Sequence, residues 1–211
     1  MAGDAVVHVV DDDVAVRQSL SFLLASDGLP VRLHDSAVAF LDAVTEAPTG
    51  CIVTDVRMPG IDGIEFLRRL RARGIALPVI VMTGHADVPL AVEAMKQGAV
   101  DFIEKPFDDD LFLAAVRAAL QRQEQNAHRT AQRAEVLARF ESLSERERQV
   151  LDGLVAGKAN KVIAHDLGIS PRTVEIYRAN VMTKTQAGSL SELVRMALLA
   201  GISSGDGPSA G

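Results

Sequence analysis

The feature that most constrains the fold is a set of four short apolar runs, each ending at a polar or charged residue. Segments with helical periodicity separate these runs, and each run has the length of a strand. The runs with their polar ends are Val-Val-Asp-Asp at 9–12, Ile-Val-Thr-Asp at 52–55, Val-Met-Thr at 81–83 and Phe-Ile-Glu-Lys at 102–105. In an open parallel sheet the carboxyl ends of the strands share one edge, and ligand sites lie there. The pattern therefore predicts an α/β fold whose polar strand ends converge.

Helical signals follow each predicted strand over about the first 120 residues. A second strand is expected near 30–34, and a helix from about Asp62 to Arg73. The next helix is marked by apolar residues at helical spacing, among them Val88, Val92 and Met95. Five strand–helix units in series predict a doubly wound, five-stranded parallel sheet with helices on both faces.

The character of the chain changes near residue 123, where a polar stretch without Gly or Pro begins. This stretch is expected to be a linker, either helical and continuous with the fifth helix or flexible. Ser144 and Glu147 then form a capping-box pattern, which predicts the start of a helix. The predicted organisation is a first domain at 1–122, a linker at 123–141, a small all-α four-helix domain at 142–202 and a disordered tail at 203–211.

Composition limits the class of protein. Hydrophobic residues make up 48% of the chain, but no run of 18 or more apolar residues occurs, so a membrane-spanning protein is not expected. The N-terminus has no signal-peptide pattern, and a cytoplasmic location is the default. The single Cys51 rules out a disulfide framework. Residues 1–122 carry a net charge of −7 and residues 123–211 a net charge of +1, which suggests two modules with different partners.

The polar strand ends predict a site for a divalent cation and a phosphoryl group. Asp11, Asp12 and Asp55 would place three carboxylates close together, and a hard cation such as Mg²⁺ would offset their repulsion. Asp55 could then act as a nucleophile and form an acyl phosphate, while Lys105 and Thr83 bind phosphoryl oxygens. An isolated Asp at a strand end is usually a loop or cap residue. The joint placement of these residues favours the site.

The C-terminal module contains a helix–turn–helix pattern. A short helix at 160–167 ends at Gly168, and Ser170 with Pro171 predicts the start of the next helix. One stripe of this second helix is small, mixed and suited to a DNA major groove. That stripe consists of Arg172, Glu175, Ile176, Ala179 and Thr183. Neighbouring residues could bind phosphates, namely Lys161, Thr173, Arg178 and Lys184. The pattern alone leaves open that the pair of helices is plain core architecture.

Residues 4–122 resemble a two-component receiver domain, which has a flavodoxin-like fold. The motifs that carry this resemblance are Thr-Asp-Val-Arg-Met-Pro-Gly at 54–60, Met-Thr-Gly-His at 82–85 and Glu-Lys-Pro-Phe at 104–107. The resemblance implies that Asp55 is the phosphoacceptor. It also implies a Mg²⁺ ion bound directly by Asp12 and Asp55, through water by Asp11, and by the carbonyl of Arg57. Phe102 matches the aromatic switch position, which responds together with Thr83.

The C-terminal residues resemble the LuxR-type helix-turn-helix through Leu-Ser-Glu-Arg-Glu-Arg-Gln-Val-Leu at 143–151 and Ile-Ser-Pro-Arg-Thr-Val-Glu at 169–175. Together the two halves are similar to the FixJ family of response regulators. That resemblance implies an activator of nitrogen-fixation genes, phosphorylated by a FixL-like sensor histidine kinase. It further implies a phosphorylation-dependent homodimer, and promoter DNA and RNA polymerase as partners.

Other functions remain open from the residues alone. A response regulator of the same subfamily could serve another kinase and another set of genes. A phosphohydrolase could use Asp55 on small phosphoesters, but such enzymes usually carry an acid two residues later, where this chain has Arg57. A DNA-binding protein that does not depend on phosphorylation is a further alternative. We expect a regulator and not an enzyme.

Overall fold

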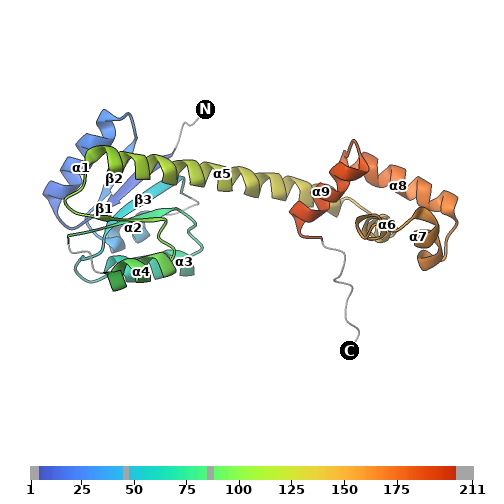
Figure 1. Cartoon of the computed structure of the whole chain (residues 1–211), viewed down its shortest axis with the longest axis horizontal. Helices are drawn as coiled ribbons and strands as arrows, with labels where there is room; N and C mark the ends of the chain where they lie inside the picture. Colours follow the sequence, from blue (N-terminus) through green and yellow to red (C-terminus); the bar gives the residue numbers. More distant parts are fainter. Residues whose placement is uncertain (1–4, 45–47, 85–87, 203–211) are drawn as a thin grey trace. The chain divides into compact units, whose positions relative to one another are not determined.

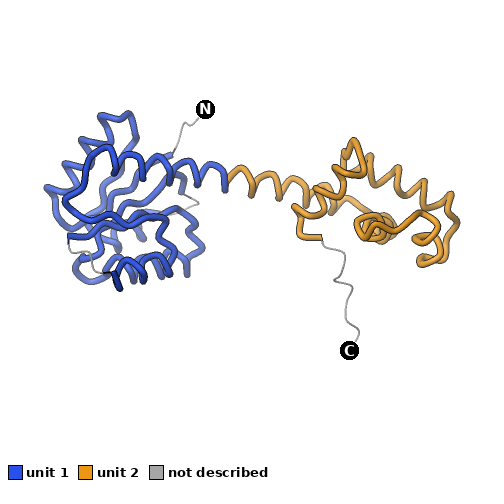
Figure 2. The backbone as a smooth tube through the Cα atoms, in the orientation of Figure 1, with its two compact units in different colours: residues 1–126 blue, residues 127–211 orange. Residues whose placement is uncertain are grey.

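A computed structural model of the chain describes residues 5–44, 48–84 and 88–202 (Figure 1). The chain divides into two compact units, Met1–Asn126 and Ala127–Gly211 (Figure 2). Each unit has apolar clusters of its own, so each can be understood from its own packing.

The first unit is built on a five-stranded sheet with the strand order β2-β1-β3-β4-β5. The strands are β1 (Val6–Val10), β2 (Val31–His34), β3 (Gly50–Asp55), β4 (Val79–Thr83) and β5 (Asp101–Glu104). Every neighbouring pair of strands is parallel, which confirms the predicted sheet. The strand order reverses direction between β1 and β3, so the crevice outside their carboxyl ends is the expected ligand position.

Helices cover both faces of this sheet. They are α1 (Val14–Ser26), α2 (Ala37–Ala43), α3 (Gly63–Ala72), α4 (Val88–Lys96) and the first part of α5 (Asp109–Glu141). Helices α1 and α5 lie on one side of the sheet, and α2, α3 and α4 on the other (Figure 1). On the first side, Leu24 and Phe112 pack in one buried cluster with Val7. On the second side, Phe40 and Phe66 are fully buried, with ring centroids 5.4 Å apart.

The central strand β3 is buried along its whole length and begins at a residue that must be Gly. Gly50 has a φ of +118°, and a Cβ there would lie 1.9 Å from the carbonyl oxygen of Val6 on the neighbouring strand. Only Gly avoids both the backbone strain and the clash. The close approach of β1 and β3 places their carboxyl ends side by side.

The second unit is helical. It contains the end of α5, followed by α6 (Glu145–Val155), α7 (Asn160–Leu167), α8 (Pro171–Thr185) and α9 (Leu190–Ala200). The capping box predicted at Ser144 is present, because its hydroxyl accepts from the amide of Glu147 and the carboxylate of Glu147 accepts from the amide of Ser144. Ser170 caps α8 and Pro171 is its first residue, also as predicted. The helix–turn–helix is thus assembled from local capping signals.

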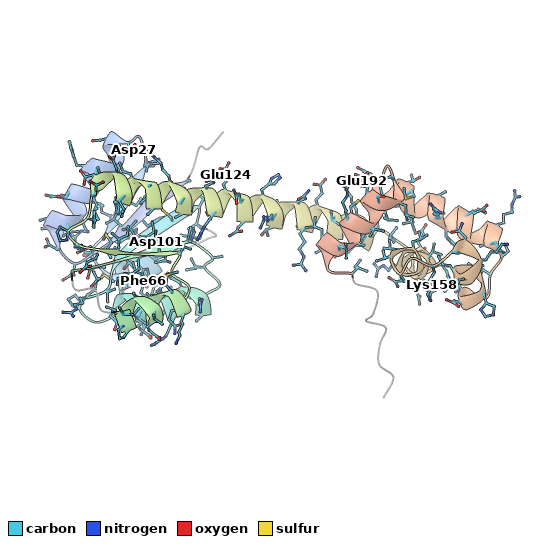
Figure 3. The ribbon with its side chains drawn as sticks, viewed as in Figure 1. Asp27, Phe66, Asp101, Glu124, Lys158 and Glu192 are labelled. Carbon is cyan, nitrogen blue, oxygen red and sulfur yellow. The ribbon has the colours of Figure 1, made fainter. Side chains whose placement is uncertain are left out.

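The segment predicted as a linker is helical and continues the fifth helix, since α5 runs unbroken from Asp109 to Glu141. Glu124, near its middle, is exposed (Figure 3). Val136 and Phe140 are nevertheless buried in the core of the second unit. That core therefore begins inside the predicted linker and not at residue 142. The predicted tail at 203–211 lies outside the described residues.

Within the described ranges, no helix is both long enough and apolar enough to cross a membrane. The longest helix, α5, is rich in polar side chains over its central turns.

Candidate functional site

Two buried carboxylates and one ammonium meet at the carboxyl edge of the sheet. Asp11 follows β1, Asp55 ends β3, and Lys105 follows β5. The Nζ atom of Lys105 lies 3.0 Å from Oδ2 of Asp11 and 2.7 Å from Oδ1 of Asp55. The residues are separated by up to 94 positions in the chain, so the sheet topology alone brings them together. The convergence predicted from the strand ends is present for these three residues.

Backbone groups fix the two carboxylates. Oδ1 of Asp11 accepts from the amide of Asp13 at 2.9 Å, and Oδ2 of Asp55 accepts from the amide of Arg57 at 2.6 Å. Each carboxylate thus has one oxygen held by the backbone and the other held by Lys105. The arrangement leaves little rotational freedom to either side chain, which suits a site that must present an oxygen in a fixed direction.

The electrostatics of the site follow from burial and from the ion pairs. Burial raises the pKa of Asp11, and this effect outweighs the opposing contributions from Asp13 and Lys105. Burial acts to lower the pKa of Lys105, but its hydrogen bonds to Asp55 and Asp11 outweigh that effect and raise the pKa. Lys105 therefore stays charged at neutral pH. Two carboxylates that share one ammonium still attract further positive charge.

The other predicted residues of this site lie around the three-residue contact. Asp12 is exposed beside Asp11, and Arg57 is exposed two residues after Asp55. Thr83, the last residue of β4, is fully buried. Phe102, on β5, is half-buried and packs against the apolar cluster beneath α2, α3 and α4.

The donors at this edge suit a hard cation, because they are carboxylate and carbonyl oxygens. The carboxylates are those of Asp11, Asp12 and Asp55, and the carbonyl is that of Arg57. In the part of the chain that the structure describes, no group of three His, Cys, Asp or Glu side chains is already arranged around a metal position. The ammonium of Lys105 instead lies between two of the predicted ligands. Oxygen atoms of the kind that a hard cation prefers therefore lie at this edge, with the Lys105 ammonium between two of them.

Contacts from outside the motifs also hold Asp11. Its amide donates to the carbonyl of His34 at 3.3 Å, and its carbonyl accepts from the guanidinium of Arg17 at 2.6 Å. Sequence reasoning missed both partners. Arg17 lies six residues after Asp11, one turn into the predicted helix, so its spacing was a usable signal. The carbonyl of His34 could be placed only by the pairing of β1 with β2.

Helix α4 exposes an apolar stripe. Val88 is 77% exposed, Val92 45% and Met95 49%. Its fully buried residue is Ala94, and α4 packs mainly on β5 and α3. The apolar periodicity that marked this helix in the sequence therefore describes, in part, a surface. Scattered exposed apolar residues are ordinary, but several aligned on one helix indicate a contact surface.

The second candidate site is the exposed side of α8. Val174 and Val181 are fully buried and hold the helix against the core. The predicted reading stripe lies on the opposite side and is exposed throughout. It consists of Arg172, Glu175, Ile176, Ala179 and Thr183. Ile176, which is 56% exposed, is the large apolar side chain of this stripe.

The residues predicted to flank this stripe occupy different environments. Lys161 is exposed and Arg178 is half-buried, and both line a surface cavity of about 480 Å³ together with Lys158. The hydroxyl of Thr173 lies 2.8 Å from that of Ser170 and so belongs to the helix cap. Two of the three cations at this cavity, Lys158 and Lys161, are exposed to solvent.

Lys184, also predicted to flank the stripe, is exposed and forms an ion pair. Its ammonium lies 2.7 Å from Oε2 of Glu147, whose side chain is only 5% exposed. The sequence identified Glu147 as a capping residue of α6 but gave no sign of this ion pair across 37 positions. The next residue, Thr185, is fully buried, and its hydroxyl donates to the carbonyl of Val181 at 2.7 Å. The end of α8 is therefore tightly packed.

Comparisons with known proteins match both halves of the chain. Residues 7–141 match the response regulator receiver domain family, and residues 141–197 match the luxR family of bacterial regulatory proteins. The chain is 66% identical over 200 residues to the transcriptional regulatory protein FixJ of Azorhizobium caulinodans, covering 95% of each chain. It is 58% identical to FixJ of Bradyrhizobium diazoefficiens, covering 93% of this chain and 96% of that one. Among solved structures, the response regulator StyR matches with a TM-score of 0.81 and 39% identity, over 93% of this chain and 99% of that one.

Proposed function

The chain belongs to the FixJ-like response regulators, which join a receiver domain to a LuxR-type DNA-binding domain, and we propose that phosphorylation of Asp55 switches it into a transcriptional activator. The observation that carries this proposal is the contact of Lys105 with both Asp55 and Asp11 at the sheet edge. This contact holds the Asp55 carboxylate in place beside a positive charge. The same chain also carries an exposed helix, α8, that is suited to reading DNA.

The proposed reaction is transfer of a phosphoryl group from a phosphohistidine of a sensor kinase to the carboxylate of Asp55. A P–O bond to Asp55 forms, the P–N bond breaks, and the kinase histidine leaves as the neutral imidazole after taking up a proton. Lys105 provides a positive charge for the incoming phosphoryl oxygens, and the amide of Arg57 keeps the second carboxylate oxygen oriented. In this scheme the phosphoryl donor is a FixL-like sensor kinase, and Asp55 is the acceptor.

Mg²⁺ is the proposed cofactor. Asp11, Asp12 and Asp55 with the carbonyl of Arg57 would hold it, and it would supply positive charge that lets two anions approach each other. The fit rests on the oxygen chemistry of these donors and on the contact of Lys105 with two of them, Asp11 and Asp55.

The proposed switch uses two residues near the site. Thr83 is buried at the end of β4, where its hydroxyl can turn toward a phosphoryl oxygen. Phe102 is half-buried on β5, the strand beside β4, so a change at Thr83 can alter its packing. The surface formed by α4 and β5 is then the part of the receiver that changes.

Dimerisation through that surface is the proposed consequence. The exposed stripe of Val88, Val92 and Met95 offers apolar area that a second copy of the chain could cover. A dimer would present two copies of α8 to DNA with two-fold symmetry, as a near-palindromic site requires. Binding by one copy should be weak, and dimerisation should raise the affinity strongly.

The proposed DNA contacts divide into two groups. Arg172, Glu175, Ile176 and Ala179 would read base edges, while Thr173, Lys161 and Arg178 would bind the backbone. Promoter DNA and RNA polymerase are the proposed partners, and the cytoplasm is the proposed location. We take nitrogen-fixation genes as the targets, on the strength of the similarity to the two FixJ relatives. Another kinase and another set of genes remain the alternative.

Labelled acetyl phosphate with Mg²⁺ tests the first half of this proposal. The full chain should take up one label and shift toward a dimer, whereas Asp55→Asn should do neither. Label retained by Asp55→Asn would place the phosphoacceptor elsewhere. Steady turnover of a phosphoester by the unmodified chain would instead favour a phosphohydrolase.

A further inference from the structure

We infer that Glu147 is a positioning residue for DNA recognition: its buried carboxylate holds Lys184 and thereby fixes the C-terminal end of α8. The inference rests on the proposed DNA-binding function. It also gives Lys184 a role different from the phosphate contact that the sequence predicted. The contacts concerned lie at one corner of the second unit, where α5, α6 and α8 meet.

The first step is the geometry of Glu147. Its Oε2 accepts from the amide of Ser144 at 2.8 Å and from the ammonium of Lys184 at 2.7 Å. The hydroxyl of Ser144 in turn accepts from the amide of Glu147. The carboxylate is thus tied to the first turn of α6 and has one position in which to receive Lys184. The hydrogen bond from Lys184 and that from Ser144 also lower the pKa of Glu147, so it stays ionised.

The second step is the availability of Lys184. Its side chain is 41% exposed, but the carboxylate that it contacts is 5% exposed. Moving the ammonium to a DNA phosphate would break this short charged contact and leave the Glu147 carboxylate with only the amide of Ser144. Lys161 differs, because it is exposed and lines an open cavity. Lys184 is therefore held in the protein while Lys161 can bind phosphate.

The third step is that further contacts hold the same end of α8. The guanidinium of Arg139 on α5 donates to the carbonyl of Thr185 at 3.3 Å, and Lys184 also reaches the carbonyl of Ser142 at 3.5 Å. Positive side chains at a helix C-terminus interact favourably with its dipole. The reading stripe lies on the preceding turns of α8, so fixing this end sets the direction in which the stripe points.

The test compares charge-neutral variants of the phosphorylated full chain on two DNA fragments. One fragment is selected by footprinting with the unmodified protein, and the other is the same sequence shuffled. Affinity is measured over a range of salt concentrations for Glu147→Gln, Lys184→Gln and the double variant. Lys161→Gln is the matched control, because it removes the same charge from an exposed lysine. Thermal unfolding of each variant shows that the second unit is folded at the assay temperature.

Positioning predicts that Glu147→Gln and Lys184→Gln each lose about tenfold in affinity for the selected fragment and little for the shuffled one. The double variant should be no worse than either single variant. The salt slope should stay unchanged for these variants, whereas Lys161→Gln should lower it by about 0.9 per protomer. If the Glu147–Lys184 pair only stabilised the fold, the ratio of the affinities for the two fragments would be unchanged in a folded variant.

The inference is overturned if Lys184→Gln lowers the salt slope as Lys161→Gln does, or if both fragments lose affinity equally. Should either single variant fail to fold, the double variant decides alone, because it removes both charges and leaves neither one unpaired. If the unmodified protein selects no fragment at all, the proposed DNA-binding function fails, and the inference fails with it.

Discussion

The stability of the receiver should depend on pH through one buried histidine, His8 on β1. Its side chain is 5% exposed, and its Nδ1 lies 3.2 Å from Nε2 of His34 on β2. The ring of Phe40 stands edge-on to it, with centroids 5.1 Å apart. Burial, reinforced by the neighbouring charges of His34 and Arg32, lowers the pKa of His8 from 6.5 to about 4.

The sign and size of the effect follow from these values. In the unfolded chain His8 takes up a proton as the pH falls through 6.5, but in the folded chain it does so only near pH 4. Between these values the unfolded state binds more protons, so the free energy of unfolding decreases as the pH falls. The full difference is about 3 kcal/mol, of which roughly 2 kcal/mol is lost by pH 5. The lowered pKa of His34 acts in the same direction, and the raised pKa of Asp11 acts against it.

Comparison with His8→Leu isolates the effect of this residue, because the other groups are common to both proteins. Cys51 provides a probe confined to the receiver, since it is fully buried in β3 and is the only cysteine in the chain. Urea unfolding at pH 7.5 and pH 5.0 can be followed by pulse labelling of the exposed thiol with a dithiodipyridine, which reacts in mildly acidic solution. Between the two pH values, the free energy of unfolding should fall by about 2 kcal/mol more in the unmodified protein than in His8→Leu. Equal losses in the two proteins would refute the reasoning.

Three further predictions concern other parts of the receiver. Val92→Glu should abolish the phosphorylation-dependent dimer in sedimentation experiments while leaving labelling of Asp55 intact. A dimer as stable as that of the unmodified protein would show that the α4 surface is not the dimer interface. Gly50→Ala should destabilise the receiver by about 3 kcal/mol or more in the Cys51 assay, because a Cβ there meets the backbone of β1 and a φ of +118° is strained. Lys105→Met should lower the free energy of unfolding of the receiver by about 1–3 kcal/mol at pH 7.5 and by less at pH 5.0, because a carboxylate left without its cation can be protonated at the lower pH. A decrease that does not depend on pH would contradict this explanation.

The receiver was predictable because topology determines where its strand ends lie. Once the strands are parallel and alternate with helices, residues such as Asp55 and Lys105 must reach the same edge, however far apart they are in the chain. Their mutual distance and the position of the ammonium between two carboxylates needed the structure. The carbonyl of His34 beside Asp11 could not be predicted, because it depends on strand register.

The second unit shows where sequence patterns fail. Glu147 and Ser144 were correctly identified as a capping box, because that signal is local. The partner of Glu147 was missed, because Lys184 lies on another helix and looks like a surface lysine in the sequence. Phe140 was assigned to a polar linker, since two buried positions in a mostly exposed helix give only a weak periodic signal.

The central claim is that phosphorylation of Asp55 controls DNA binding. Footprinting on genomic fragments tests it most directly, with the full chain before and after treatment with acetyl phosphate and Mg²⁺, and with Asp55→Asn treated in the same way. We predict a protected site that appears, or strengthens by at least tenfold, only in the treated unmodified protein. Equal protection by all the samples would contradict the account and would show a DNA-binding protein that does not depend on phosphorylation.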